Sequence, residues 1–341
     1  MTLPTSGLIT LGDINEELGR SRTAAIQLDK AENGDYGTIN TCSPFYPVAG
    51  NPAKISEWYG YNHNAVCSYS TKSLDCTDNT TTELIYGDDW STVSQSQPKL
   101  NSDGEGFSVA WWNQIKSEQA NEYYFTSLQG STSGSSSVTK GWHIRAENQT
   151  NGNSFLILEI NDNSLSITWK AQINSSNNTS ITSISTDKKW GIGTGYQVGS
   201  QNANNFTHLA FTYDSGQTGA DAVKMYWNGV ELQDITATSS DSLSNITWDT
   251  EFLSVGGSFP GEGGSGCFFD EYTLFYENKL EESEVGEIYN SGAPQAASNY
   301  SFTYNNTLYR FEQAGSLGTD TEGTYDLNNS QGSPASSTQH A

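Results

Sequence analysis

The sequence predicts a mainly β protein, an antiparallel β-sandwich preceded by a small α+β module. From residue 68 onward, short segments rich in β-branched and aromatic side chains alternate with clusters of Asn, Gly, Ser and Asp, which is the pattern of strands joined by turns. Aromatic residues make up 12% of the chain and charged residues 16%, a mixture that favours many short strands over helices. With 341 residues, the chain is long enough for one large domain or two unequal ones.

The first 64 residues are expected to form the small module. The segment 13–16 (DINE) matches a capping box with Asp13 as the N-cap, so a short helix is expected that ends at Gly19. Residues 25–28 are predicted to be a brief strand. A second helix is expected later in this module.

This second helix is predicted to begin at Asn51, the N-cap, and to end at Gly60. A segment of this size buries a low fraction of its surface, so it has little core of its own. The aromatic side chains at its end are therefore expected to pack against a larger body, with an ordinary core as the alternative. They are Trp58, Tyr59 and Tyr61.

The sandwich is predicted from its strands and one clear hairpin. The strands are expected at 107–112, 155–160, 165–169, 206–213, 223–227 and 252–255. Asn228-Gly229 supplies the positive φ angles of a two-residue hairpin turn. Alternation before the turn assigns Val223, Met225 and Trp227 to one face of the sheet and Lys224 and Tyr226 to the other.

An aromatic-rich strand at 266–276 is followed by a short Leu- and Glu-rich helix. This strand carries an acidic pair, Asp270 and Glu271. Acids at a strand–helix junction commonly accept hydrogen bonds from nearby backbone amides, so the pair is expected to hold this junction together.

The charge of the chain restricts its partners. With 15 basic and 39 acidic residues, the formal net charge is -24, which would repel a phosphate backbone and excludes nucleic acid as a partner. No apolar run is long enough to span a bilayer and no signal peptide is apparent, so the chain is expected to fold in a cytoplasm without membrane insertion.

Four cysteines are too few for a disulfide framework and lack the spacing of metal ligands. They are Cys42, Cys67, Cys76 and Cys267. Cys76 and Cys267 lie in strand-like apolar surroundings, where a thiol behaves as a small hydrophobic group. All four are expected to be thiols.

Several short blocks near the N-terminus resemble an N-terminal module of bacteriophage structural proteins. The blocks lie at 3–7, 14–21, 26–28 and 55–61, and their order and spacing agree with that module. The resemblance covers residues 3–63 and implies a place in a virion, in a tail, a fibre or a head appendage.

The region 65–299 resembles the laminin G-like, or concanavalin A-like, jelly-roll family. The matching blocks occur in family order at 72–75, 107–112, 206–214, 226–229, 253–257 and 269–271. The C-terminal tail, 300–341, contains a segment at 307–312 that looks like the first strand of such a domain. We expect this strand either to close the chain's own sandwich by circular permutation or to be exchanged with a neighbouring subunit.

Exposed aromatic side chains on loops are the expected ligand-binding residues, because a flat apolar face with polar partners suits a sugar ring. The candidates are Trp90, Trp142, Trp190 and Tyr196. No catalytic residue is assigned. A glucanase of this fold carries Glu-X-Asp-X-X-Glu on one strand, and the nearest segment, 159–163, lacks the second Glu.

No cofactor is required by these features. Members of the resembled family often bind Ca2+ through Asp and Asn oxygens, so calcium stays open as an alternative, with Asp75, Asp78 and Asp270 as ligand candidates. No Asp-X-Asp-X-Asp-Gly loop is present.

The resulting expectation is a bacteriophage virion structural protein, assembled in the cytoplasm of the bacterial host, that displays a lectin-like sandwich for binding host surface glycans. The N-terminal module would bind other virion proteins, and a homotrimer is the expected oligomer. The alternatives are a purely structural decoration or spacer protein without a ligand, a bacterial surface adhesin, and a glycan hydrolase.

Overall fold

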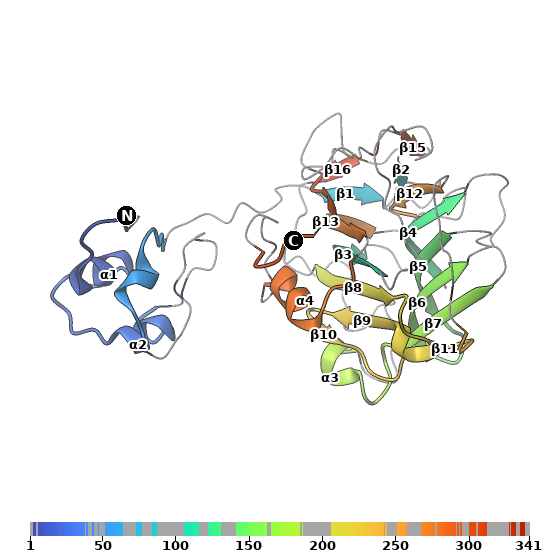
Figure 1. Cartoon of the computed structure of the whole chain (residues 1–341), viewed down its shortest axis with the longest axis horizontal. Coiled ribbons are helices and arrows are strands. Elements are labelled where there is room, and N and C mark those ends of the chain that lie inside the picture. Colours follow the sequence, from blue (N-terminus) through green and yellow to red (C-terminus); the bar gives the residue numbers. More distant parts are fainter. Residues whose placement is uncertain are drawn as a thin grey trace. The chain divides into compact units, whose positions relative to one another are not determined.

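The computed structural model divides the chain into two compact units, the first built from Met1–Tyr69 and Gln295–Asn299 and the second from Ser70–Pro294 and Tyr300–Ala341 (Figure 1). The residues that the structure describes are 3–4, 6–37, 39, 43, 47, 52–63, 73–76, 84–86, 106–115, 122–130, 141–161, 165–184, 186, 206–241, 243, 251–257, 267–276, 278–290, 292, 294, 300–304, 306–311, 327, 329–331 and 335–337. The first boundary lies five residues beyond the expected end of the module at residue 64.

The first unit contains the helices α1 (Leu11–Glu17) and α2 (Leu28–Glu32) and the 3-10 turn η1 (Ile55–Trp58). The capping box of α1 is displaced by three residues from the expected one. Thr10 is the N-cap: its hydroxyl accepts from the Asp13 amide at 3.2 Å, and the Asp13 carboxylate accepts from the Thr10 amide at 2.8 Å. Asp13 was therefore correctly linked to the start of this helix, but it is the third helical residue and not the cap.

Two further expectations for this unit were wrong. Residues 25–28 do not form a strand: 25–27 have no regular structure, and Leu28 begins α2. The second helix is only the four-residue turn η1, whose N-cap is Lys54; Asn51, the expected cap, lies outside the described residues.

The aromatic residues of η1 and its continuation form a core within the first unit. Trp58 and Tyr61 are fully buried and meet edge to face, with ring centroids 5.3 Å apart. They pack with five smaller buried residues, Leu3, Ile9, Ile14, Leu18 and Ala31. The alternative that these aromatics are ordinary core is therefore confirmed for Trp58 and Tyr61.

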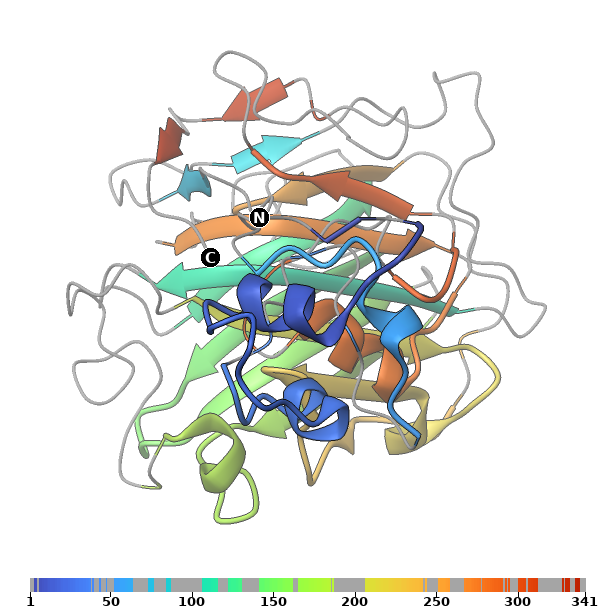
Figure 2. The ribbon, with the colours of Figure 1, turned by 90° about the vertical axis from the view of Figure 1, so that its left-hand side faces the viewer.

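The second unit is an antiparallel β-sandwich, as the sequence predicted. Among the described residues, its first sheet has the strand order β10-β9-β8-β3-β13-β1-β16, and β14 also pairs with β13. The strands are β1 (Ser73–Cys76), β3 (Gly106–Ile115), β8 (Thr207–Asp214), β9 (Val223–Trp227), β10 (Val230–Glu231), β13 (Cys267–Tyr276), β14 (Asn306–Tyr309) and β16 (Ala335–Ser337). Figure 2 shows β13, in orange, beside β3, in teal.

The second sheet has the order β11-β7-β6-β5-β4-β12-β2-β15 among the described residues. Its strands are β2 (Leu84–Tyr86), β4 (Glu122–Gly130), β5 (Gly141–Asn148), β6 (Ser154–Asn161), β7 (Ser166–Gln172), β11 (Thr236–Ala237), β12 (Glu251–Val255) and β15 (Asn329–Gln331). The short elements α3 (Thr179–Thr182) and η2 (Gly219–Ala222) lie in connections.

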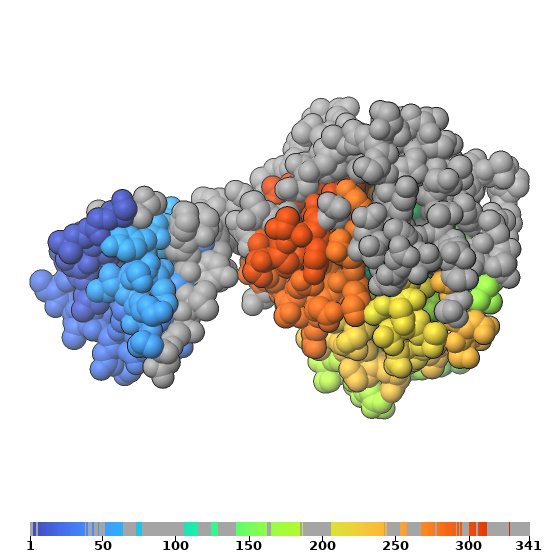
Figure 3. Space-filling model, in the orientation of Figure 1, coloured from blue at the N-terminus to red at the C-terminus, as the bar shows by residue number. Residues whose placement is uncertain are grey.

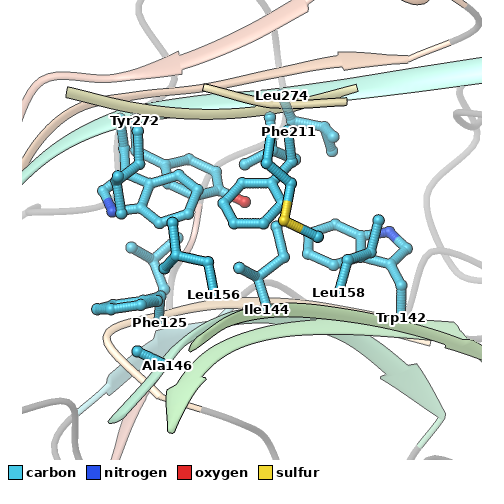
Figure 4. Close-up of a cluster of buried hydrophobic side chains, with 14 of the residues drawn as sticks. Phe125, Trp142, Ile144, Ala146, Leu156, Leu158, Phe211, Tyr272 and Leu274 are labelled. Atoms are coloured by element: carbon cyan, nitrogen blue, oxygen red, sulfur yellow. The ribbon is translucent and has the colours of Figure 1, made fainter. Parts of the chain in front are cut away.

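The main core fills the space between the two sheets. Trp111 of the first sheet stacks on Phe211, with ring centroids 5.7 Å apart, and also meets Phe125 of the second sheet at 5.6 Å. Figure 4 shows Phe125, Trp142 and Ile144 pointing from one sheet toward Phe211 and Leu274 of the other. Large aromatic side chains thus account for much of the contact between the sheets.

The predicted hairpin is confirmed. Asn228 and Gly229 connect β9 to β10 with φ angles of 49° and 78°. The faces also agree with the alternation: Val223, Met225 and Trp227 belong to the main core, whereas Lys224 is exposed and Tyr226 joins a second apolar cluster.

We expect Gly229→Ala to destabilise the sandwich by about 2–3 kcal/mol, because the new Cβ must adopt a left-handed φ and would lie 2.7 Å from Tyr289 Cδ1. Gly286→Ala in helix α4 (Glu282–Tyr289) is the matched control. A Cβ there meets no atom within 4 Å, so this change should stabilise by roughly 0.5–1 kcal/mol through helix propensity. Urea unfolding measures both changes, and equal effects of the two variants would contradict the expectation.

The acidic pair of β13 does not lie at the strand–helix junction, so that expectation was wrong. Asp270 and Glu271 lie within the strand, at a β-bulge where the register with β3 shifts and Glu271 has a φ of 46°. The Asp270 carboxylate accepts from the Glu271 amide at 2.9 Å, and Glu271 Oε2 lies 3.2 Å from Arg310 Nε. Glu271 therefore links β13 to Arg310, the residue that follows β14.

A second apolar layer covers part of the outer face of the first sheet. Leu280, Val285 and Ile288, at and within α4, pack with Ala110, Ala210, Tyr226 and Phe275 of that sheet. An extended aromatic segment, Tyr300, Phe302 and Tyr304, packs against the same cluster, and the Tyr304 hydroxyl donates to Glu284 at 2.8 Å. In Figure 3 the orange and red atoms of this region form one continuous patch on the sandwich unit.

The C-terminal part of the chain contributes strands to both sheets. β14 pairs with β13, β16 with β1, and β15 with β2 (Figure 1). β1 and β14 share one edge of β13: β1 pairs with its residues 267–269 and β14 with residues 272–275. The hypothesis that this tail is permuted or exchanged between subunits stays a prediction.

Candidate functional site

The predicted ligand-binding residues do not come together in the described part of the structure. Trp142 is 1% exposed and stacks on Phe107 in the main core, with ring centroids 5.3 Å apart, so its assignment to a ligand site was wrong (Figure 4). The other three, Trp90, Trp190 and Tyr196, lie outside the described residues.

The chemically richest group among the described residues is on the outer face of the second sheet. Alternation directs Trp142, Ile144 and Ala146 of β5 into the core, so the intervening residues of that strand lie on the opposite face. Strand pairing then adds residues from β4, β6 and β7. We call this group the Arg145 face; it consists of Tyr124, His143, Arg145, Glu147, Glu159 and Lys170.

Register sets the order of side chains across this face. Tyr124 lies opposite Arg145, and Arg145 lies opposite Ile157, which in turn lies opposite Lys170. Ile157 is fully buried, so the row combines an aromatic ring, two cations and an apolar centre. A parallel row pairs His143 with Glu159 and Glu159 with Thr168.

Glu147 is the hub of the charged contacts. Its Oε2 lies 3.0 Å from Arg145 Nη1 and 3.9 Å from Lys170 Nζ, and its Oε1 accepts from Gln149 at 2.9 Å. Burial alone would raise the pKa of the Glu147 carboxyl, but the hydrogen bonds from Gln149 and Arg145 and the charge of Lys170 outweigh it and lower that pKa. Glu147 is therefore a carboxylate near neutral pH.

A second contact joins His143 to Glu159. His143 Nε2 lies 3.5 Å from Glu159 Oε2, an ion-pair distance longer than a well-formed hydrogen bond. The imidazole lowers the pKa of the Glu159 carboxyl, and Ser166 Oγ donates to Glu159 Oε1 at 3.3 Å. The ring of Tyr124 meets that of His143 edge to face, with centroids 5.8 Å apart.

The Arg145 face offers the groups that bind a polar ligand. Arg145, Glu147 and Lys170 have side chains only 13%, 19% and 31% exposed, so they are partly desolvated but not fully buried. Desolvation strengthens hydrogen bonds to charged groups, and an aromatic ring beside such groups suits the apolar face of a sugar. The arrangement can therefore bind and orient a hydroxyl-rich ligand.

The two carboxyl groups of this face are not prepared for glycosidase chemistry. They belong to neighbouring strands, β5 and β6, and Glu159 lies opposite His143. Both carboxyl pKa values are lowered, so neither group is prepared to donate a proton as a general acid.

Two of the three calcium candidates, Asp75 and Asp270, lie on adjacent strands of the first sheet, and calcium binding stays a prediction. Asp75 lies opposite Phe268, and Asp270 lies opposite Trp112 in the next ladder, where its carboxylate accepts from a neighbouring amide. Asp78 lies outside the described residues. Across the described ranges, no three His, Cys, Asp or Glu side chains are grouped as a metal ion requires.

The sequence contained a signal for the Arg145 face that the loop-centred prediction did not use. Polar residues at 143, 145 and 147 alternate with apolar ones at 142, 144 and 146, which is the period of a strand with one buried face. Alternation within one strand does not reveal which strands pair with it, so the sequence could not assign Glu159 and Lys170 to this group.

The comparisons with known proteins find similar structures but no family. No protein-family model matches the chain, and no curated protein matches it. Within the described part of the chain, no helix has the length and apolar character needed to cross a membrane.

The similar structures include the NanB sialidase of Streptococcus pneumoniae, with 17% identity and a TM-score of 0.37, over 55% of this chain and 24% of the sialidase. The CBM40 domain of the Ruminococcus gnavus IT-sialidase, bound to α2,3-sialyllactose, has 14% identity and a TM-score of 0.34, over 61% of this chain and 95% of that domain. A botulinum neurotoxin serotype D/C binding domain has 13% identity and a TM-score of 0.33, over 56% of this chain and 37% of that one. The function of this chain is therefore inferred from its own residues.

Proposed function

We propose that the sandwich is a non-catalytic glycan-binding domain and that its ligand binds on the Arg145 face. The observation that carries this proposal is the half-buried row of Tyr124, Arg145 and Lys170 around the buried Ile157, with Glu147 bridging the two cations. Lys and Arg number only 15 in the chain, so two of them on one row of a strongly acidic protein mark this surface as distinct.

The experiment compares Arg145→Gln with Lys224→Gln on a glycan array and by calorimetry. Each variant removes one cation from an ion pair on a strand, since Lys224 Nζ lies 3.0 Å from Glu231 Oε2, but Lys224 belongs to the other sheet. Losing a hydrogen bond from a charged group should weaken glycan binding about tenfold or more in Arg145→Gln, while Lys224→Gln stays within about twofold. Thermal melting of both variants is the control, and it should show that both keep the fold.

Two outcomes would count against this proposal. If the unaltered protein binds no glycan and does not compete for adsorption to host cells, the purely structural alternative is favoured. That alternative has support in the structure, because Arg145 and Lys170 already form ion pairs with Glu147. If Arg145→Gln binds as tightly as the unaltered protein, the ligand binds elsewhere on the sandwich.

We further propose that the protein is a component of a bacteriophage virion, attached through its first unit and assembled as a homotrimer. The support is the set of N-terminal sequence blocks at 3–7, 14–21, 26–28 and 55–61. Mass spectrometry of purified virions should find the chain, and labelled protein imaged on intact particles should show where it sits on head, tail or fibre. Its absence from virions would favour a cellular adhesin.

A further inference from the structure

Two cysteines that are far apart in the sequence face each other in the first sheet. Cys76, the last residue of β1, and Cys267, the first residue of β13, are direct partners in the antiparallel ladder. Both side chains belong to the main core, so they project from the same face of the sheet, and both are buried. They are thiols that no disulfide joins.

The ladder geometry suits a covalent bond between them. Directly opposed residues of an antiparallel pair have Cα atoms about 4.5 Å or about 5.5 Å apart, depending on the hydrogen-bond pattern. Both spacings lie within the roughly 4.4–6.8 Å that disulfides require. The backbone spacing of such a pair is therefore one that a disulfide can span.

Because the two cysteines lie at strand ends, local opening can expose them to a small reagent. Among the residues that the structure describes, the ladder between β1 and β16 covers Ser73, Leu74 and Asp75, and Cys76 is the next residue along β1. Ends of strands open locally more readily than their centres, so the β1 end can separate transiently from β13 without unfolding the sandwich.

We propose that Cys76 and Cys267 are a covalent modification site, at which a cross-strand disulfide forms and ties β1 to β13. The oxidant is a small-molecule disulfide. One protein thiolate attacks it, which forms a mixed disulfide and releases one small thiol; the second protein thiolate then attacks the mixed disulfide and releases the other. Two protein thiols and one small disulfide thus become one protein disulfide and two small thiols.

The bond would close a loop of 191 residues, 267 minus 76, and so constrain the unfolded chain strongly. It would also join β1, the first strand of the sandwich unit in chain order, to β13 in the first sheet. This inference does not depend on the proposed glycan ligand.

The test uses the full chain carrying Cys42→Ser and Cys67→Ser, so that only the proposed pair remains. The reduced protein is refolded in a glutathione redox buffer, in which both thiols are accessible during folding, and is then alkylated, digested and analysed by mass spectrometry. We expect peptides containing Cys76 and Cys267 to be recovered linked, and the oxidised protein to melt roughly 5–10 °C above the reduced one. The unsubstituted chain treated in the same way should give the same linked peptides.

The matched control adds Cys267→Ala, after which the oxidant should leave the melting temperature unchanged and no linked peptide should form. Recovery of alkylated Cys76 and Cys267 from the correctly refolded protein would overturn the proposal. So would a linked product found only between chains, because the strand register requires a bond within one chain.

Discussion

Removal of residues 300–341 is expected to abolish cooperative folding of the sandwich. The deletion takes β14 from β13, β16 from β1 and β15 from β2, so both sheets lose a strand at their margins. It also removes four buried apolar side chains, Leu308, Tyr309, Phe311 and Leu327. At roughly 1.5–3 kcal/mol each, their burial contributes about 6–12 kcal/mol, which is comparable with the whole stability of a typical domain.

Loss of this segment also exposes apolar side chains and a strand edge on the part of the sandwich that remains. Tyr309 stacks near Tyr272, with ring centroids 6.0 Å apart, and Phe302 lies 6.1 Å from Phe275. Without these partners, the edge of β13 at 272–275 presents unpaired backbone groups, which favours aggregation. Circular dichroism during heating, together with binding of a hydrophobic dye, measures both effects.

Two point variants show how much single side chains of the deleted segment contribute to stability. Leu308→Ala should destabilise by about 2–5 kcal/mol, since it leaves a cavity beside β13. Thr303→Ala changes an exposed residue of the same segment and should have an effect within about 0.5 kcal/mol. An unchanged melting temperature after the deletion would contradict the view that these strands complete the sandwich.

The oligomeric state of the full chain separates the two forms of the permutation hypothesis. If the tail is exchanged between subunits, light scattering should show that the folded full chain is always an oligomer, even at low protein concentration. If the tail closes its own sandwich, the folded chain can be a monomer. In either case, a separate peptide of residues 300–341 added to the truncated chain should restore part of the folded signal.

The second large effect is expected in acid, from His208. This residue of β8 is fully buried, lies 5.2 Å from the Trp112 ring and 5.8 Å from the Tyr289 ring, and neither of its ring nitrogens has a hydrogen-bond partner among the described residues. His208 therefore contributes to packing between β8 and the rings beside it. Burial lowers the pKa of His208 to about 3, because the charged imidazolium would be desolvated without a partner.

The direction of the effect follows from proton binding. The ordinary pKa of 6.5 applies to the unfolded chain, so between pH 6.5 and about 3 the unfolded state binds more protons at His208 than the folded state does. The stability that the neutral ring contributes is complete above pH 6.5 and is lost as the pH falls through this window. The loss is about 2 kcal/mol at pH 5 and approaches roughly 5 kcal/mol near pH 3.

His208→Phe keeps an aromatic ring in the cluster of Trp112, Phe206 and Phe268 and removes the titrating group. Urea unfolding of both proteins at pH 7 and pH 5 should show that the variant loses about 2 kcal/mol less than the original over this interval. The carboxylates are the same in both proteins and cancel in the comparison. Parallel stability curves for the two would refute this role of His208.

Prediction from the sequence succeeded where the deciding interactions are local. The hairpin at Asn228 and Gly229 was predictable because positive φ angles at two consecutive residues are a property of the turn itself. The helix α1 was predicted with a displaced cap, because Thr10 and Asp13 can both begin a capping box and only the folded chain shows which one does. Residues 25–27 show the opposite case, since β-propensity without a partner strand does not make a strand.

The candidate site was less predictable. Trp142 was assigned to a ligand because of its Gly- and Ser-rich surroundings, yet its alternation with His143 and Arg145 places it in the core. Neighbouring Gly and Ser residues indicate where a strand ends, but they do not indicate which face of the sheet its side chains occupy. The Arg145 face depends on four strands, β4 to β7, brought side by side, and the sequence of one strand does not show which strands lie beside it.

By itself, the sequence determined the class of the fold, the alternation within its strands and the acidic character of the chain, because these depend on composition and on the geometry of neighbouring residues. Only the tertiary structure decided that Arg145 and Lys170 share Glu147, that Cys76 faces Cys267, and that the C-terminal strands join both sheets. The reason is physical: strand pairing is selected by the burial of distant segments against one another, and a shift of one residue in register would turn every one of these side chains to the other face.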